Sequence, residues 1–203
     1  MPARAKATGP DMQAGPSGGA DTAAREELRL ISRVAAEDMA AFESLYRAYH
    51  PRLVRFLHGM LRQGALTEEV LDDTMLVVWR RAHTFDGSAK LSTWLFAIAY
   101  RQALKALRQR GCEPGLDEEP AAPCDAEPDS RLQQQQLHAC LDEALATLSV
   151  EHRAVIELTY YLGHSCREIA DIVDCPVATV KTRMFHARRR LRSALGSVRE
   201  QLS

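Results

Sequence analysis

The chain has 203 residues, the length of one or two small domains, and 46% of them are hydrophobic, as in an ordinary globular protein. No apolar run approaches the length of a membrane span, and the N-terminal residues lack the apolar core of a secretory signal, so we expect a cytoplasmic protein without direct membrane insertion. The five cysteines are an odd number with no C-x-x-C pair, which argues against a disulfide framework and a structural zinc site.

The formal net charge of -1 hides a strong segregation of charge along the chain. Residues 111–130 include seven acidic side chains and no basic one, whereas residues 176–199 include seven basic side chains and no acidic one. Binding follows the local field rather than the total charge, so the C-terminal block is able to attract phosphate.

The N-terminal half is predicted to be a disordered tail followed by a helical domain. Residues 1–23 lack apolar periodicity and are expected to form the tail, and residues 24–110 the domain. Pro51 predicts a kink or a new helix within the first apolar stretch, and Thr67 is expected to cap the start of the next helix. A loop at residues 84–90 then precedes a third long helix, on whose apolar faces Trp79 and Trp94 are interpreted as core residues.

Residues 111–131 are predicted to be a flexible acidic linker, because a stretch rich in proline and acidic residues buries too little apolar surface to offset its ordering entropy. Residues 132–203 are helical again, and no segment shows sustained alternation with a period of two. The predicted fold class is therefore all-α, with two small helical domains joined by the linker and a helix-turn-helix in the C-terminal domain.

The helix-turn-helix is predicted from local signals. Gly163 is a plausible helix stop, and Ser165 with Glu168 has the spacing of a capping box. Pro176 is suited to open the following helix, which carries one apolar stripe formed by Val180, Met184, Ala187 and Leu191. The opposite face of that helix is basic, as expected for a helix that enters the major groove of DNA.

Both halves of the chain resemble extracytoplasmic-function sigma factors. Residues 166–183, with the lead-in at 144–153, resemble the fourth conserved region of that family. Four segments resemble the second conserved region of the family: Asp73 to Trp79, Phe85-Asp86-Gly87, Ser92-Thr93-Trp94-Leu95 and Ile98-Ala99. The resemblance covers roughly residues 24–110 and 135–197.

The resemblance implies a dissociable sigma subunit of bacterial RNA polymerase, acting in transcription regulation and stress response. Its first domain would dock on the clamp helices of the largest polymerase subunit and open the -10 element, and its second would read the -35 element and contact the polymerase flap. An anti-sigma protein is implied as a further partner. The linker would run through the channel that RNA later occupies, where it acts either as a polyanion or as a simple spacer.

Matching positions assign the expected contacts. Those to the -35 element are Thr179, Lys181, Thr182, Phe185, His186 and Arg188. Those to the -10 element are Asp86, Gly87, Ser88, Ala89 and Lys90 in the loop. The spacing of Arg101, Lys105 and Arg108 predicts a basic stripe on one helix, which is either a further contact to -10 phosphates or an ordinary solvated helix face. Those to polymerase are Asp72 and Asp73. Two positions depart from the family: His186 replaces a frequent arginine, and Asp72 replaces the usual glutamine.

Three other classes of protein stay open from the residues alone. An ordinary helix-turn-helix regulator would bind an operator with half-site symmetry and without polymerase. An enzyme is disfavoured because the chain has no Gly-rich phosphate loop, no H-E-x-x-H and no nucleophile elbow, and no cofactor is expected. A metal or redox switch would use His138, Cys140, His164, Cys166 and Cys175, but their spacing is unlike that of a zinc knuckle, and we expect no metal.

Overall fold

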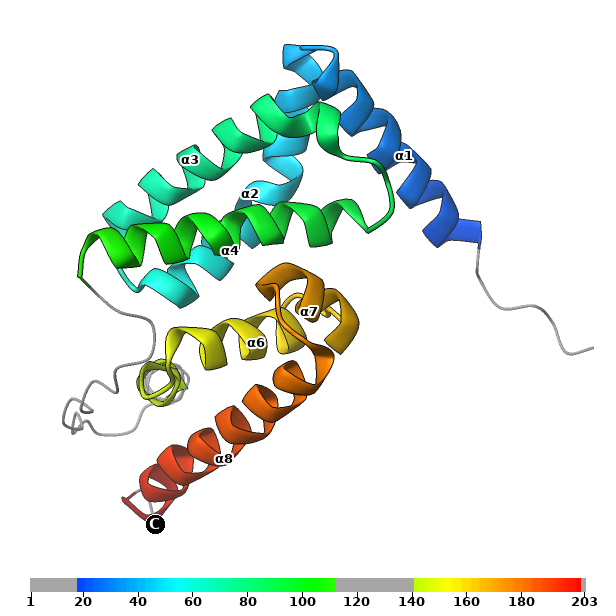
Figure 1. The fold of residues 1–203 in the computed structure, drawn as a ribbon. Coiled ribbons are helices and arrows are strands. Elements are labelled where there is room, and N and C mark those ends of the chain that lie inside the picture. The colour runs from blue at the N-terminus through cyan, green and yellow to red at the C-terminus, as the bar shows by residue number, and fades with distance from the viewer. Residues whose placement is uncertain (1–17, 112–140, 202–203) are drawn as a thin grey trace, which may run out of the picture.

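The structure is a computed structural model that describes residues 18–111 and 141–201, and every regular element in these two ranges is helical (Figure 1). The elements are α1 (Gly18–Ala35), α2 (Met39–Leu61), α3 (Gly64–Arg81), the 3-10 turn η1 (Ala82–Thr84), α4 (Leu91–Gln109), a helical stretch at residues 141–146, α6 (Val150–Tyr160), α7 (Cys166–Val173) and α8 (Val177–Gln201). Within the described ranges, no helix is both long and apolar enough to cross a membrane.

The first domain is a bundle in which α2, α3 and α4 pack against one another and α1 covers one end (Figure 1). Its core is aliphatic and aromatic: Phe56 on α2 meets Phe96 on α4 edge-on, with the ring centroids 5.3 Å apart. Trp79 and Trp94 are half-buried and pack against this core, as expected, with Phe42 and Phe85 as their aromatic neighbours.

The second domain is the predicted helix-turn-helix. Its capping box is confirmed: the Ser165 hydroxyl accepts the Glu168 backbone N–H, and the Glu168 carboxylate accepts the Ser165 backbone N–H. Gly163, with φ 71°, follows the end of α6, and Asp174 ends α7 in the left-handed conformation with φ 53°. The predicted apolar stripe of α8 is also confirmed, with Val180, Met184 and Ala187 buried and Leu191 half-buried.

The two domains are packed directly on each other. The α7 helix lies against α4, and α6 lies against α2, so one cluster of buried residues runs through both domains (Figure 1). The sequence did not predict this contact, because it joins segments that lie far apart in the chain. The predicted linker at 111–131 lies, apart from Gly111, outside the described residues.

A buried arginine anchors the start of the second domain and reaches the first. Arg153 on α6 is 6% exposed, and its guanidinium donates hydrogen bonds to backbone carbonyls in both domains. The acceptors are Leu145, Ala146 and Leu148 in its own domain, and Gly59 and Met60 at the end of α2. Because the last carbonyls of a helix have no partner within it, these donors satisfy groups that burial would otherwise leave unpaired.

The first domain differs from the sequence expectations at three points. The helix α1 begins at Gly18, within the stretch expected to be a disordered tail, while residues 1–17 lie outside the described residues. The helix α2 continues through Pro51 to Leu61, so of the two expected outcomes, a kink or a new helix, the new helix does not form. The helix α3 begins at Gly64, and Thr67 is a buried residue inside it whose hydroxyl donates to the Gln63 carbonyl; burial of Leu66 and Thr67 against the core extends the helix beyond the apparent cap.

Candidate nucleic-acid interface

The face of α8 that carries the predicted -35 contacts, defined here as its recognition face, is exposed to solvent. Lys181, Thr182, His186 and Arg188 are exposed, and Thr179 is half-buried. Phe185 lies on the same face and is 62% exposed. The capping box starts α7 and the left-handed Asp174 ends it, directly before α8. The side chains on this face of α8 are therefore positioned by the local structure of the helix-turn-helix.

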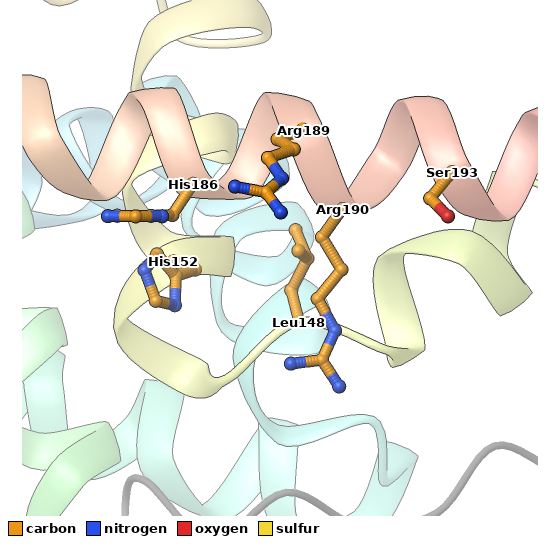
Figure 2. Close-up of a pocket in the computed structure, with 6 residues that line it drawn as sticks. All are labelled: Leu148, His152, His186, Arg189, Arg190 and Ser193. Atoms are coloured by element: carbon orange, nitrogen blue, oxygen red, sulfur yellow. The ribbon is translucent and has the colours of Figure 1, made fainter.

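A basic cavity of about 410 Å³ opens beside this face, between α8 and the start of α6 (Figure 2). Its lining consists of Leu148, His152, His186, Arg189, Arg190 and Ser193. Figure 2 shows His152 beneath His186, and their ring centroids are 6.3 Å apart. Burial is the main cause that lowers the pKa of His152, and the neighbouring positive charges of Arg183 and Arg190 lower it further. A cavity of this charge suits an anionic group such as a DNA phosphate.

The orientation of His152 is set by the cap of α6. The Ser149 side chain lies 2.7 Å from Nδ1 of His152, and its oxygen accepts the His152 backbone N–H. The Ser149 hydroxyl and Nδ1 are thus within hydrogen-bond distance, and the tautomer of the imidazole decides which of the two donates. The grouping of His152, Arg189, Arg190 and Ser193 was not predicted from the sequence. The i, i+4 spacing of Arg189 and Ser193 indicates a shared face of α8, but nothing in the sequence indicates that α6 packs beside it.

The loop between η1 and α4 is short and internally braced. The Asp86 carboxylate accepts the Ser88 backbone N–H at 2.9 Å, and hydrogen bonds from Ser88 lower the pKa of Asp86. Gly87 has φ 76°, and a Cβ added there would lie 3.2 Å from Leu28 on α1. Ala89 and Lys90 complete the loop, and both are exposed. The loop thus presents polar groups from a fixed turn.

The other predicted contacts of the first domain lie on two surfaces. Arg101, Lys105 and Arg108 are all exposed on α4, where their spacing places them in one stripe. Asp72 and Asp73 are exposed on α3. The α4 stripe and the loop belong to the same domain, but the predicted -35 contacts lie on α8, so the structure assembles two separate cationic surfaces.

One predicted contact, Lys90, is paired with a carboxylate of the other domain. The Lys90 ammonium nitrogen lies 2.7 Å from a carboxylate oxygen of Glu168, the residue that closes the capping box of α7. Burial alone would raise the pKa of Glu168, but hydrogen bonds from Lys90 and Ser165 prevail and hold it at about 2. The carboxylate is therefore charged at neutral pH and directly engaged with the loop.

The cysteines of the helix-turn-helix pack as small apolar residues. Cys166 and Cys175 are free and half-buried against the core. Among the described residues, no group of three or more histidine, cysteine or acidic side chains is placed to hold a metal ion. His138 and Cys140 lie outside the described residues.

Comparisons with known proteins match both domains. The model of Sigma-70 region 2 matches residues 45–112, and that of Sigma-70, region 4 matches residues 138–191. ECF RNA polymerase sigma factor RpoE of Cereibacter sphaeroides is 36% identical over 159 residues, which cover 76% of this chain and 86% of that protein. ECF RNA polymerase sigma factor SigL of Mycobacterium tuberculosis is 31% identical over 173 residues, which cover 81% of this chain and 94% of that protein.

Two solved structures are similar to this chain. The sigma factor RpoE in complex with the anti-sigma factor NepR from Bartonella quintana superposes with a TM-score of 0.60 at 28% identity, covering 76% of this chain and 96% of that one. CnrH in complex with the cytosolic domain of CnrY shares the fold, with a TM-score of 0.61 at 22% identity, covering 83% of this chain and 96% of that one.

Proposed function

The chain belongs to the ECF RNA polymerase sigma factors, and we propose on this basis that its two cationic surfaces contact two elements of one promoter. It is a transcription initiation factor and not an enzyme: it directs core polymerase to specific promoters and takes part in melting the -10 element. The observation that carries the promoter assignment is the exposed recognition face of α8. The helix that precedes it, α7, begins with a fully formed capping box.

The second domain is proposed to read the -35 element. Thr179, Lys181 and Thr182 occupy the first turns of α8, where a recognition helix contacts base edges in the major groove. Phe185 and His186 follow, and Arg188 holds the DNA backbone. The basic cavity beside His186 supports this arrangement, because the phosphates that flank a major-groove contact need cationic partners.

The first domain is proposed to capture the -10 element. The loop from Asp86 to Lys90 receives a base flipped out of the stack, which costs a few kcal/mol that contacts in the loop must offset. Arg101, Lys105 and Arg108 run along the phosphates beside the melted strand. The loop precedes the first residue of α4 and the basic stripe lies in the second half of the same helix, which supports this division of roles.

Core polymerase is proposed to bring the two surfaces into register. Asp72 and Asp73 on α3 contact the clamp helices of the largest subunit, and the second domain contacts the flap. Each domain alone makes few DNA contacts, so affinity depends on polymerase holding both at the correct separation. The domains are proposed to correspond to the expected ranges 24–110 and 132–203, with α1 extending the first of them to Gly18.

An anti-sigma protein is proposed as the regulatory partner. A relative solved in complex with such an inhibitor, the Bartonella quintana sigma factor, aligns with most of this chain. Because sigma factors of this family act on polymerase in the cytoplasm, we place the protein there.

Run-off transcription with purified bacterial core polymerase tests the function. The protein is added to core polymerase on a pool of promoter fragments, and the 5′ ends of the transcripts are mapped. Specific starts that require the protein are expected. Failure to associate with core polymerase, together with tight binding to a symmetric operator by the protein alone, would instead identify an ordinary helix-turn-helix regulator.

A further inference from the structure

The loop proposed to capture the -10 element is held by local contacts at both of its ends. At its start, the Asp86 carboxylate accepts the Ser88 backbone N–H at 2.9 Å. The Phe85 ring before the loop and the Trp94 ring after it pack together, with their centroids 5.5 Å apart. Both rings are half-buried against the core of the first domain. These contacts fix where the loop leaves and rejoins the domain, but none of them involves Gly87 itself.

Gly87, at the tip of the loop, lies against a side chain of the first helix. A Cβ added to Gly87 would lie 3.2 Å from Cδ2 of Leu28. Among the described residues, no second atom beyond the adjacent residues lies within 4 Å of that point. Gly87 has φ 76°, a conformation that a residue without a Cβ adopts at no steric cost. Leu28 thus provides the contact between α1 and the tip of the loop.

The helix that carries Leu28 is anchored by other side chains. Ile31 and Val34 on α1 are buried in the core of the first domain, and the Glu27 carboxylate accepts a hydrogen bond from the Tyr49 hydroxyl at 2.9 Å. The helix packs against α2 and η1, and Figure 1 shows the loop between η1 and α4 beside it. Leu28 itself is 42% exposed, so it contributes little to the core. Its contact with the loop can therefore be removed while α1 stays in place.

We propose that Leu28 is a positioning residue for capture of the -10 element: its side chain supports Gly87 and so holds the loop in the shape that receives the flipped base. The proposal rests on the proposed function of the loop. Leu28 acts through the loop backbone rather than by touching the base. The support for -10 capture thereby extends to α1, which precedes the residues matched by Sigma-70 region 2.

The physical reason is the cost of ordering a loop with glycine at its tip. Glycine has more backbone freedom than any other residue, so an unsupported Gly87 would populate several loop shapes. Only the shape that accepts the base contributes to binding, and the apparent dissociation constant rises in inverse proportion to the population of that shape. Support from Leu28 keeps this population high before the base arrives, so that the contacts made on binding offset the unstacking of the base.

Three variants separate support of the loop from general damage to the domain. Leu28→Ala removes the methyl groups that meet Gly87, and alanine is at least as good a helix former as leucine, so α1 is not weakened. Leu28→Met restores an apolar side chain of similar volume and should behave like the parent. Met39→Ala is the matched control, because Met39 is an apolar residue of the same domain that is 64% exposed and belongs to neither proposed DNA-binding surface.

Base capture is measured with the full-length protein bound to core polymerase. The probe is a fluorescent single strand that carries the -10 element of a promoter mapped by run-off transcription. Abasic sites are introduced one at a time, and the position where loss of the base weakens binding by the parent most identifies the captured base.

The expected result is a loss of affinity that depends on that base. Leu28→Ala should raise the dissociation constant for the intact strand about fivefold, as for a competent loop shape that falls to about one fifth of the population. On the strand that lacks the captured base, Leu28→Ala should bind like the parent. Leu28→Met and Met39→Ala should match the parent on both strands.

Two results of this experiment would overturn the proposal. Equal affinity of parent and Leu28→Ala for the intact strand would show that the loop needs no support from α1. An equal loss of affinity on the intact and the abasic strand would show that the substitution damages the domain rather than the capture of the base.

Support of the loop is also measured without DNA or polymerase, by hydrogen exchange of backbone amides in the free full-length protein. The amides of residues 86–90 should exchange faster in Leu28→Ala than in the parent, whereas those of α8 should be unchanged. Unchanged exchange in the loop would overturn the support itself. Faster exchange in the loop, together with a lack of specific transcription starts, would instead overturn the proposed function and with it the role of Leu28 in promoter capture.

Discussion

The imidazole of His164 and the ring of Phe96 meet edge-on where the two domains touch, with their centroids 5.5 Å apart. His164 is buried, and its Nε2 atom has no hydrogen-bond partner among the described residues. Burial is the main reason that the pKa of His164 lies below its ordinary value; Glu168 opposes the shift, whereas Arg52 and Lys90 reinforce it. Burial in this contact therefore favours the neutral imidazole.

Replacing this histidine by an aromatic ring without nitrogen should stabilise the protein. His164→Phe removes an unpaired buried polar atom, and we expect the free energy of unfolding at pH 7.5 to rise by about 1 kcal/mol. The parent has a lower pKa in the folded than in the unfolded state, so it loses stability through this group as the pH falls below about 6.5. Urea unfolding at pH 7.5 and 5.5 measures both effects, and a variant that gains nothing at pH 5.5 relative to parent would contradict them.

A second buried group should titrate in the opposite sense. Burial raises the pKa of Glu157 to about 6, although Arg55 and Arg153 oppose the shift. The folded state therefore holds its proton more tightly than the unfolded state, and the stability linked to Glu157 is fully present below about pH 4.5 and is lost as the pH rises through about 6.

Glu157→Gln should remove that loss. We expect the variant to exceed the parent at pH 7.5 by up to about 2 kcal/mol and to match it near pH 4.5. Denaturant unfolding across this range is the measurement. Lower stability of the variant at pH 7.5 would mean that attraction to the two arginines outweighs the desolvation of the carboxylate.

Lys181 should contribute to promoter choice. We expect Lys181→Ala to reduce transcription about tenfold at promoters that depend on the -35 element, since one base contact in the groove is worth roughly 1–3 kcal/mol. Arg47→Ala, which removes an exposed positive charge from α2, is the control and should transcribe like the parent. Equal output from Lys181→Ala and parent at moderate salt would show that this side chain makes no contact.

Arg101 should contribute affinity without sequence preference. We expect Arg101→Ala to weaken promoter binding uniformly across sequences and to lower the slope of log affinity against log salt concentration by about one, as for the loss of one phosphate contact. Titrations of the polymerase complex at several salt concentrations measure this slope. An unchanged slope would place Arg101 away from the DNA.

The parts of the fold that sequence patterns predicted are those set by neighbours in the chain. The capping box of Ser165 and Glu168 and the apolar stripe of α8 depend on residues within one or a few turns, and both are confirmed. The start of α3 was misplaced because Thr67 has the chemistry of a cap, whereas burial against α2 and α4 decides where the helix begins. Tertiary packing overrode the local preference.

The candidate site was predictable only where it lies on one helix. The face of α8 could be read from its own spacing, but the cavity needs His152 from α6, and no periodicity links two helices that meet in space. The pairing of Lys90 with Glu168 likewise joins residues 78 positions apart. Such contacts depend on how folded helices and domains pack against one another, and the local patterns of a single sequence do not indicate that packing.

The first helix has a consequence for any shortened version of the protein. The match to Sigma-70 region 2 begins at residue 45, after α1 has ended. Yet Leu28 of α1 lies against Gly87, and Glu27 accepts a hydrogen bond from the Tyr49 hydroxyl at 2.9 Å. A chain trimmed to the matched residues would therefore lose the helix that supports the loop proposed to capture the -10 element, and a weak melting activity in that fragment would reflect the missing support rather than the matched region itself.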